Sequence, residues 1–245
     1  LQHDYLSLPA RTLVPLFEGL PASGTVDEAR QRLLAWDFVL APDSVEAGIY
    51  VAFERRFLEN MRALKVPEVG RENVRLGMKR AIDFILAPDG DFGADPMAGR
   101  DAFLLRALEE GIATLTESLG GDMKDWVYGQ AGYKHALITH PLSPAVDEEI
   151  RQRLDVGPVP RGGNGHTLNN TGGDDNQASG ASFRIFVDLR DWDNTLGMNA
   201  PGQVGDPDSP LYDNLFELWA KDKVFPAFFT REKIESVAFE RLELR

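Results

Sequence analysis

Ser182 is the residue whose surroundings look most like those of a hydrolytic nucleophile. It lies in the stretch GASFR (180–184), which begins like the turn that presents the nucleophilic serine of many hydrolases. That turn carries a second glycine, where Arg184 stands here, and it lies between a strand and a helix. Because Ser182 is expected to begin a strand, we favour a structural serine. An independent hydrolase that uses Ser182 with His140 or His166 is the weakest hypothesis.

Acidic residues gather at two places and could in principle bind calcium. Asp188, Asp191 and Asp193 are close in sequence, as are Asp174 and Asp175. The spacing of a calcium loop, with a central glycine and a final glutamate, is absent. We therefore expect these aspartates to cap turns.

Histidine spacing gives no support for a metal site either. His135 and His140 are an odd number of residues apart in an expected strand, so their side chains should point to opposite faces. Local chemistry alone therefore predicts no catalytic constellation, no metal ligands and no cofactor-binding residues.

A long polar segment, residues 155–181, is the remaining candidate for a site. It begins near a glycine-rich stretch, RGGNGH (161–166), which no helix follows, so a nucleotide-binding loop is not expected. Connections of this length are usually functional or disordered. Its polar side chains could line a cleft, or, as the favoured alternative, could bond to their own backbone. The cleft candidates are His166, Asn169, Asn170, Asn176 and Gln177.

The first half of the chain, residues 1–125, is expected to be mainly helical. Thr25 and Glu28 have the spacing of a capping box, and 43–46 repeats that signal ahead of a long helix. The apolar pattern continues over 71–86. A further helix is predicted from about residue 101 to Gly120-Gly121, where glycine ends it.

The second half, residues 126–245, is expected to be rich in strands. Strands are predicted over 133–140 and 182–189, with 195–199 returning as a hairpin. A short helix is predicted at 214–221, and 237–244 is typical of a strand. Helices followed by antiparallel strands indicate an α+β protein.

Composition excludes several classes of protein. The formal net charge of −13 argues against a nucleic-acid partner, and the absence of cysteine excludes disulfides and thiol nucleophiles. No apolar run approaches the roughly 20 residues of a membrane span. The chain begins with Leu rather than Met, so we expect it to be processed or truncated.

Three stretches together are similar to a known family. The chain opens with LQHDYLSLPARTLVPLF, continues at 126–143 with WVYGQAGYKHALITHPLS, and has a third stretch at 175–234 that includes FRIFVDLRDWDNTLGMNAPGQVGDPDSPLYDNLFELW. Their order and spacing resemble the C-terminal part of the large subunit of the penicillin acylase family of N-terminal-nucleophile hydrolases. The resemblance covers nearly all 245 residues and is densest over 126–234. Val204 and Leu211 depart from it, because the family more often has Ser and His at these positions.

The resemblance implies a self-cleaving precursor of an amidohydrolase with an αββα sandwich fold. A Ser at the new N-terminus of the large subunit attacks the amide carbonyl with its own α-amine as base, and an Asn side chain and backbone N–H groups hold the oxyanion. Substrate classes include acylated β-lactams and acyl-homoserine lactones. This chain has no Ser-Asn dipeptide, and the nucleophile, oxyanion Asn and calcium-binding acids of the family belong to segments upstream.

The expected function is therefore that of a C-terminal fragment, inactive alone, of a penicillin-acylase-like enzyme. Its expected partners are the small subunit and the N-terminal part of the large subunit, and its expected location is the periplasm or outside the cell. Such a fragment should also expose apolar sheet surface that the other segments normally cover. The alternative is a free-standing binding or scaffolding domain without catalysis.

Overall fold

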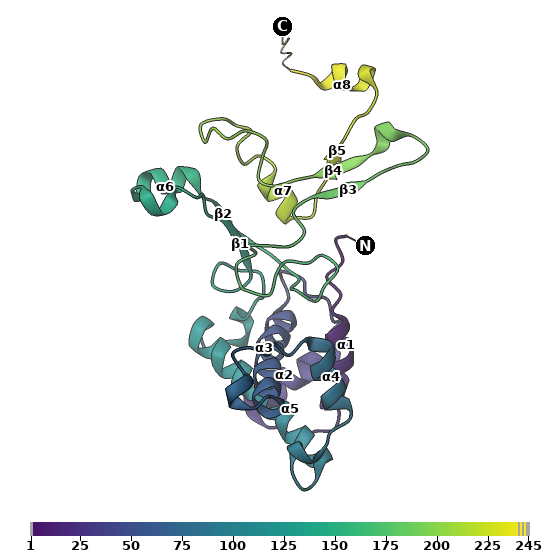
Figure 1. Cartoon of the computed structure of the whole chain (residues 1–245), viewed down its shortest axis with the longest axis vertical. Coiled ribbons are helices and arrows are strands. Elements are labelled where there is room, and N and C mark those ends of the chain that lie inside the picture. The colour runs from purple at the N-terminus through teal and green to yellow at the C-terminus, as the bar shows by residue number, and fades with distance from the viewer. Residues whose placement is uncertain (1, 240, 242, 244–245) are drawn as a thin grey trace. The chain divides into compact units, whose positions relative to one another are not determined.

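The computed structural model describes residues 2–239, 241 and 243 (Figure 1). The chain divides into two compact units. The helical unit contains His3–His135 and Pro160–Gln177, and the C-terminal unit contains Ala136–Val159 and the described residues from Ala178 onward. A boundary after residue 125, as inferred from the sequence, stays a prediction.

Five α-helices build most of the helical unit, as the sequence predicts for the first half of the chain (Figure 1). Short 3-10 turns connect several of them. The helices are α1 (Leu8–Leu13), α2 (Gly24–Ala35), α3 (Val45–Lys65), α4 (Met78–Leu86) and α5 (Pro96–Leu119).

Helix α3 is the centre of this unit and begins where the sequence predicts. The Ser44 hydroxyl accepts the Ala47 N–H at 3.0 Å, which satisfies one of the free donors of the first turn. Helix α5 packs against α3 at Gly111, where an added Cβ would lie 2.9 Å from backbone atoms of Ala52 and Phe53. A side chain at Gly111 would therefore force the two helices apart.

The core of the helical unit contains a chain of aromatic rings. Phe53 is completely buried, and its ring centroid lies 5.1 Å from that of Phe17 and 5.8 Å from that of Phe57. Phe57 in turn makes an edge contact with Phe103 of α5 at 6.0 Å. These contacts join three helical segments through large apolar side chains, which dominate core energetics.

Two predicted helix starts are wrong. Helix α2 begins at Gly24 after Ser23, so Thr25 lies inside the first turn and does not act as the predicted cap. Helix α5 begins at Pro96 rather than near residue 101, because the Asp95 carboxylate accepts the N–H groups of the next helical residues and proline suits the first helical position. Gly120, with a φ of 93°, ends α5 as predicted.

Helix α4 is shorter than the predicted 71–86. Arg71 is not helical, because its guanidinium donates to carbonyls at the C-terminal end of α3: to Ala63 at 2.7 Å and to Val66 at 3.0 Å. These bonds hold the chain in a turn after α3, so the apolar period before Met78 does not become helix.

The C-terminal unit contains short strands and helices (Figure 1). Strands β1 and β2 form one sheet, and β3, β4 and β5 form another in that order. The elements are β1 (His135–Ile138), α6 (Glu148–Leu154), β2 (Val156–Pro160), β3 (Arg184–Phe186), β4 (Leu196–Met198), α7 (Phe216–Ala220), β5 (Phe225–Pro226) and α8 (Arg231–Val237).

These elements confirm the α+β prediction, although the strands are shorter than expected. Strands β3 and β4 form the predicted antiparallel hairpin, with Arg184 opposite Met198. Strand β2 lies inside the segment that was expected to be a loop, residues 155–181. The strand predicted at 237–244 is wrong at Val237, which ends α8, and residues 240, 242 and 244 lie outside the described part of the chain.

The two faces of the β3–β4–β5 sheet differ. On one face Met198 is buried, and Arg184 donates to the backbone oxygen of Trp219 at 3.0 Å. On the other face lie Ile185, Gly197 and Phe225, which are directly opposite one another across the three strands. Ile185 is 43% exposed on this second face, and the apolar residues that flank β3 in the sequence are also exposed: Phe183 63%, Val187 53% and Leu189 84%.

Candidate functional site

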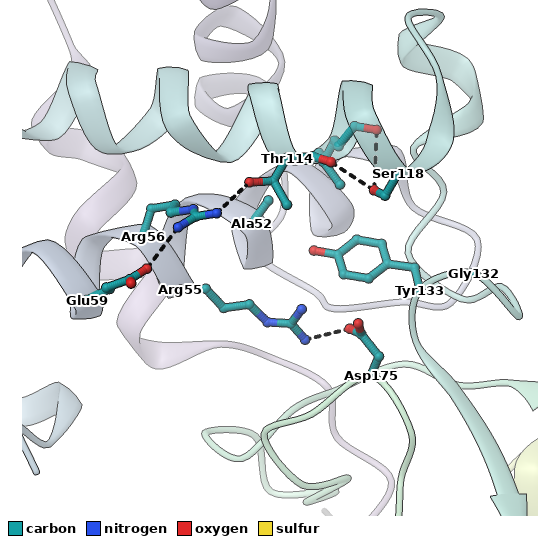
Figure 2. A pocket seen from close by; sticks show the side chains of 10 residues that line it. Ala52, Arg55, Arg56, Glu59, Thr114, Ser118, Gly132, Tyr133 and Asp175 are labelled. Atoms are coloured by element: carbon teal, nitrogen blue, oxygen red, sulfur yellow. Dashed lines mark hydrogen bonds and ion pairs between the residues drawn. The ribbon is translucent and has the colours of Figure 1, made fainter. Parts of the chain in front are cut away.

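A pocket of about 340 Å³ opens between α3 and α5 in the helical unit (Figure 2). Helix α3 contributes two consecutive arginines, Arg55 and Arg56, and α5 contributes Thr114. Tyr133 and Asp175 complete its lining from the segments near β1. The pocket therefore combines charged groups with an aromatic ring, a composition that suits binding of a small polar molecule.

Each guanidinium in this pocket is paired with a carboxylate. Arg55 donates to Asp175 at 2.7 Å and lies 5.5 Å from the centre of the Tyr133 ring. Arg56 donates to Glu59 at 2.9 Å and to the Thr114 hydroxyl, as Figure 2 shows. The pocket thus presents two balanced ion pairs rather than a concentrated positive charge.

Lys134 is a buried cation next to this pocket. Its ammonium donates to three backbone carbonyls, those of Thr171 at 2.9 Å, Gly172 at 3.3 Å and Asp174 at 2.5 Å. Burial, assisted by Arg55, lowers the pKa of Lys134 to about 8. A lysine with a lowered pKa can act as a nucleophile, but this side chain is completely buried and all three donors are engaged. Its geometry supports a structural role that fixes the polypeptide at 171–174.

His166, one of the predicted cleft residues, lies against α3. Its Nδ1 is 3.1 Å from Oε1 of Glu54, a buried carboxylate in the middle of α3. Asn164 donates to the same oxygen at 2.9 Å and accepts the His166 N–H at 2.8 Å. The histidine therefore belongs to a polar cluster that joins the 161–177 segment to the helix.

The other predicted cleft residues make ordered contacts within the helical unit. Asn169 is fully buried, and its backbone bonds to Asp4. Asn176 forms a bridge with His135, and Gln177 accepts a hydrogen bond from Arg161 at 2.8 Å. None of the predicted residues lines the pocket between α3 and α5, and their role in a cleft stays a prediction.

Sequence reasoning missed the residues that organise this region. Asn164 lies within the glycine-rich stretch but was not among the predicted site residues. Lys134 lies in a segment that the sequence predicts as a strand. Glu54 was passed over on a helix whose apolar stripe it does not share. In the sequence Glu54 lies in the charged run FERRF (53–57), which is typical of an exposed helix face, so no local signal marks it as buried.

Ser182 does not form a nucleophile–base pair in the C-terminal unit. Its side chain is exposed, and its N–H donates to the Gly180 carbonyl. His140 accepts the Leu142 N–H on Nδ1 instead. Within residues 2–239, 241 and 243, no cluster of three or more His, Asp or Glu side chains could hold a metal ion. Over the same residues, no helix is long and apolar enough to cross a membrane.

The chain is similar in sequence to several curated acylases. An acyl-homoserine lactone acylase QuiP of Pseudomonas fluorescens (strain Pf0-1) is 29% identical over 86% of this chain and 27% of its own length. The QuiP of Pseudomonas aeruginosa PAO1 is 25% identical over 97% of this chain and 33% of its length. The penicillin acylase 2 proenzyme of Pseudomonas sp. (strain SE83) is 28% identical over 92% of this chain and 30% of its length. The chain thus spans about a quarter to a third of the relatives it matches.

The fold also has a solved counterpart. The thermostable penicillin G acylase from Alcaligenes faecalis superimposes with a TM-score of 0.54 over 99% of this chain and 47% of that chain. The identity is 19%, so this likeness concerns the fold alone. The family model for penicillin amidase matches residues 1–236. The chain therefore belongs to the penicillin amidase family.

Proposed function

We propose that this chain is the C-terminal portion of an amidohydrolase that cleaves acyl amide bonds. The observation that carries the proposal is the family match over residues 1–236, together with relatives that are three to four times as long as the matched region. The relatives are named as acyl-homoserine lactone acylases and a penicillin acylase. Acyl-homoserine lactones and acylated β-lactams are therefore the proposed substrate classes of the whole enzyme.

The exposed apolar face of the β3–β4–β5 sheet supports the view that other segments cover this chain. Ile185 and Phe225 lie on that face, with Gly197 between them. Strand β3 is also an edge strand in its sheet. An exposed apolar face of this kind marks a site where another segment or partner packs. The proposed cover is the remainder of the same precursor: the small subunit and the N-terminal part of the large subunit.

The chemistry is proposed to reside in that remainder. A Ser at the N-terminus of the large subunit would attack the amide carbonyl, and an Asn would stabilise the oxyanion. Ser182 has no histidine partner among the described residues, which supports an inactive isolated chain. The calcium ion that the family resemblance implies does not fit here, because the described residues hold no suitable cluster. A periplasmic or secreted location belongs to the same proposal.

Comparison of the 245-residue chain with the full precursor tests this function. Both are incubated with an acyl-homoserine lactone and with a penicillin, and release of the free amine is measured. We expect turnover by the precursor and none by the chain alone. Turnover by the isolated chain that is lost in Ser182→Ala would overturn the proposal, and binding without turnover by the precursor would favour a scaffolding domain.

The coding sequence upstream of Leu1 provides a second test. A long open reading frame with a Gly-Ser-Asn junction is the expected result, because the nucleophile must become an N-terminal Ser. A start codon immediately before Leu1 would contradict the proposal, whatever the outcome of the activity assay.

A further inference from the structure

Glu54 is a buried carboxylate with one basic neighbour. Its side chain is 5% exposed and lies on α3 among core residues. Asn164 and His166 both contact Oε1, and the phenol of Tyr50 is close enough to Glu54 to interact with it. In the part of the chain that the structure describes, His166 is the single basic side chain at ion-pair distance from Glu54. The imidazole is therefore the group that can balance this buried charge.

Burial of a carboxylate without a cationic partner costs free energy, so the charge on His166 affects the stability of this part of the fold. The hydrogen bond with Glu54 raises the pKa of His166, and its attraction to the same carboxylate adds to this, while burial opposes the shift. Other titratable groups that interact with Glu54 include the phenols of Tyr50 on α3 and of Tyr128 and Tyr133 before β1, and the Arg55–Asp175 ion pair acts on the last two phenols. Burial raises the pKa of each phenol, so they stay neutral.

The turn 164–168 depends on this cluster for its attachment to α3. The residues that follow it have separate anchors, because Lys134 binds the carbonyls of 171, 172 and 174. Within the turn, Thr167 bonds only to neighbouring loop atoms, and Leu168 is 65% exposed. Asn164 supplies a neutral hydrogen bond to Glu54, and His166 supplies the one that can carry charge.

We propose that His166 and Glu54 form a pH-sensitive latch, closed while the imidazole is protonated, that holds the turn 164–168 against α3. When the imidazole loses its proton, the buried Glu54 carboxyl group loses its single cationic neighbour at ion-pair distance among the described residues. Opening of the turn then admits water to the carboxylate, which relieves the cost of its burial. His166 is about one-third exposed, so protons reach it without prior unfolding.

The direction of the pH effect follows from linkage. A folded-state pKa raised above the ordinary value of 6.5 means that the folded form binds the proton more tightly than the unfolded form. The stabilisation is therefore complete below pH 6.5, and it is lost as the pH rises through the folded-state pKa of His166. The latch is closed in acid and open in mild alkali.

Hydrogen exchange of the 245-residue chain tests the latch directly. Peptides covering 161–172 are followed by mass spectrometry from about pH 5.5 to about pH 8.5, the range in which histidine titrates, with rates corrected for intrinsic exchange. We expect the wild-type turn to lose protection as the pH rises while peptides of α5 keep theirs. Protection that does not change with pH would overturn the proposal.

Three variants separate the latch from a purely structural contact. His166→Gln keeps a donor but cannot titrate, so the pH dependence of the turn should disappear. Glu54→Gln removes the buried charge, and the turn should stay protected throughout the range. His135→Gln is the matched control in the same unit, because this histidine contacts the Tyr133 carbonyl rather than an acid, and it should behave as the wild type. A wild-type pH profile in His166→Gln would contradict the latch.

A titration of the wild-type chain keeps the proposal testable if a variant fails to fold. The imidazole proton resonance of His166 is followed by NMR over the same range. A midpoint above the ordinary value of 6.5 is expected, and a midpoint at or below it would overturn the latch. In folded Glu54→Gln the midpoint should fall towards the ordinary value.

Discussion

The helical unit buries its large apolar side chains, whereas the β3–β4–β5 sheet exposes apolar side chains on one face. In the helical unit, Phe53 is completely buried and contacts aromatic neighbours on both sides. In the sheet, Ile185 on β3 is 43% exposed, and Phe183, which precedes β3, is 63% exposed. The first arrangement forms a complete core, whereas the second leaves a surface of the kind that marks an interaction site.

Buried charged residues do not show this contrast. The helical unit buries Lys134 and Glu54 and engages both with atoms of the 161–177 segment. The sheet also buries a charge, Arg184, but on its covered face, where it pairs with Asp222 at 2.9 Å. Buried charges thus have polar partners in both units, and the two units differ in the exposure of their apolar residues.

The largest expected effect is in the aromatic core of the helical unit. Phe53→Ala removes a fully buried ring and should lower the free energy of unfolding by about 3–5 kcal/mol, because the cavity cannot collapse completely. Denaturant unfolding followed by hydrogen exchange of α3 and α5 measures this loss. Val69→Ala, at a residue 91% exposed, is the control and should change stability by less than about 0.5 kcal/mol. Equal losses in the two variants would contradict a complete core.

The second prediction concerns the buried ammonium. Lys134→Met keeps the length of the side chain but leaves three carbonyls without their donor, so the unfolding free energy should fall by about 2–4 kcal/mol. Peptides covering 171–174 should lose exchange protection first. Lys79→Met, at a side chain 89% exposed, should leave both measurements unchanged. A neutral result at Lys134 would mean that water replaces the ammonium at the carbonyls.

Local signals explain why parts of the fold were predictable. The start of α3 and the end of α5 depend on Ser44 and Gly120, which act on residues within the same turn. The β3–β4 hairpin follows from alternation along 182–189. Helix α4 was predicted too long because Arg71 bonds to the end of α3, a contact that no apolar period reveals.

The polar cluster was less predictable because its partners are far apart in sequence. Asn164 and Glu54 are 110 residues apart, and Lys134 and Thr171 are 37 apart. The sequence identified His166 as a polar candidate in the right segment. It could not reveal that this histidine contacts the buried carboxylate of Glu54. Side chains of this kind are recognised from composition only as polar residues in a loop.

The third prediction is a small effect at the pocket between α3 and α5. Asp175→Asn removes the carboxylate partner of Arg55, and the pair is partly exposed, with side chains 39% and 46% accessible. The expected loss of stability is therefore only about 0.5 kcal/mol, and it should shrink at high salt. Asp174→Asn is the control, because Asp174 contributes its backbone carbonyl rather than its carboxylate. A loss of stability independent of salt would show that Asp175 acts through packing rather than charge.

The smallest expected change in stability is on the open face of the sheet. Ile185→Thr retains the branched Cβ that suits a strand, so the unfolding free energy of the 245-residue chain should change by less than about 0.5 kcal/mol. The same substitution at Ile49, which is 1% exposed in the helical unit, should be strongly destabilising, because it buries a hydroxyl in the core. Light scattering should also show weaker self-association for Ile185→Thr, since the exposed apolar surface is smaller.

In the full precursor this variant should lose stability, because there the face is expected to be covered. An equally small change in the unfolding free energy of the chain and of the precursor would show that nothing packs on this face. The face would then stay exposed in the finished enzyme.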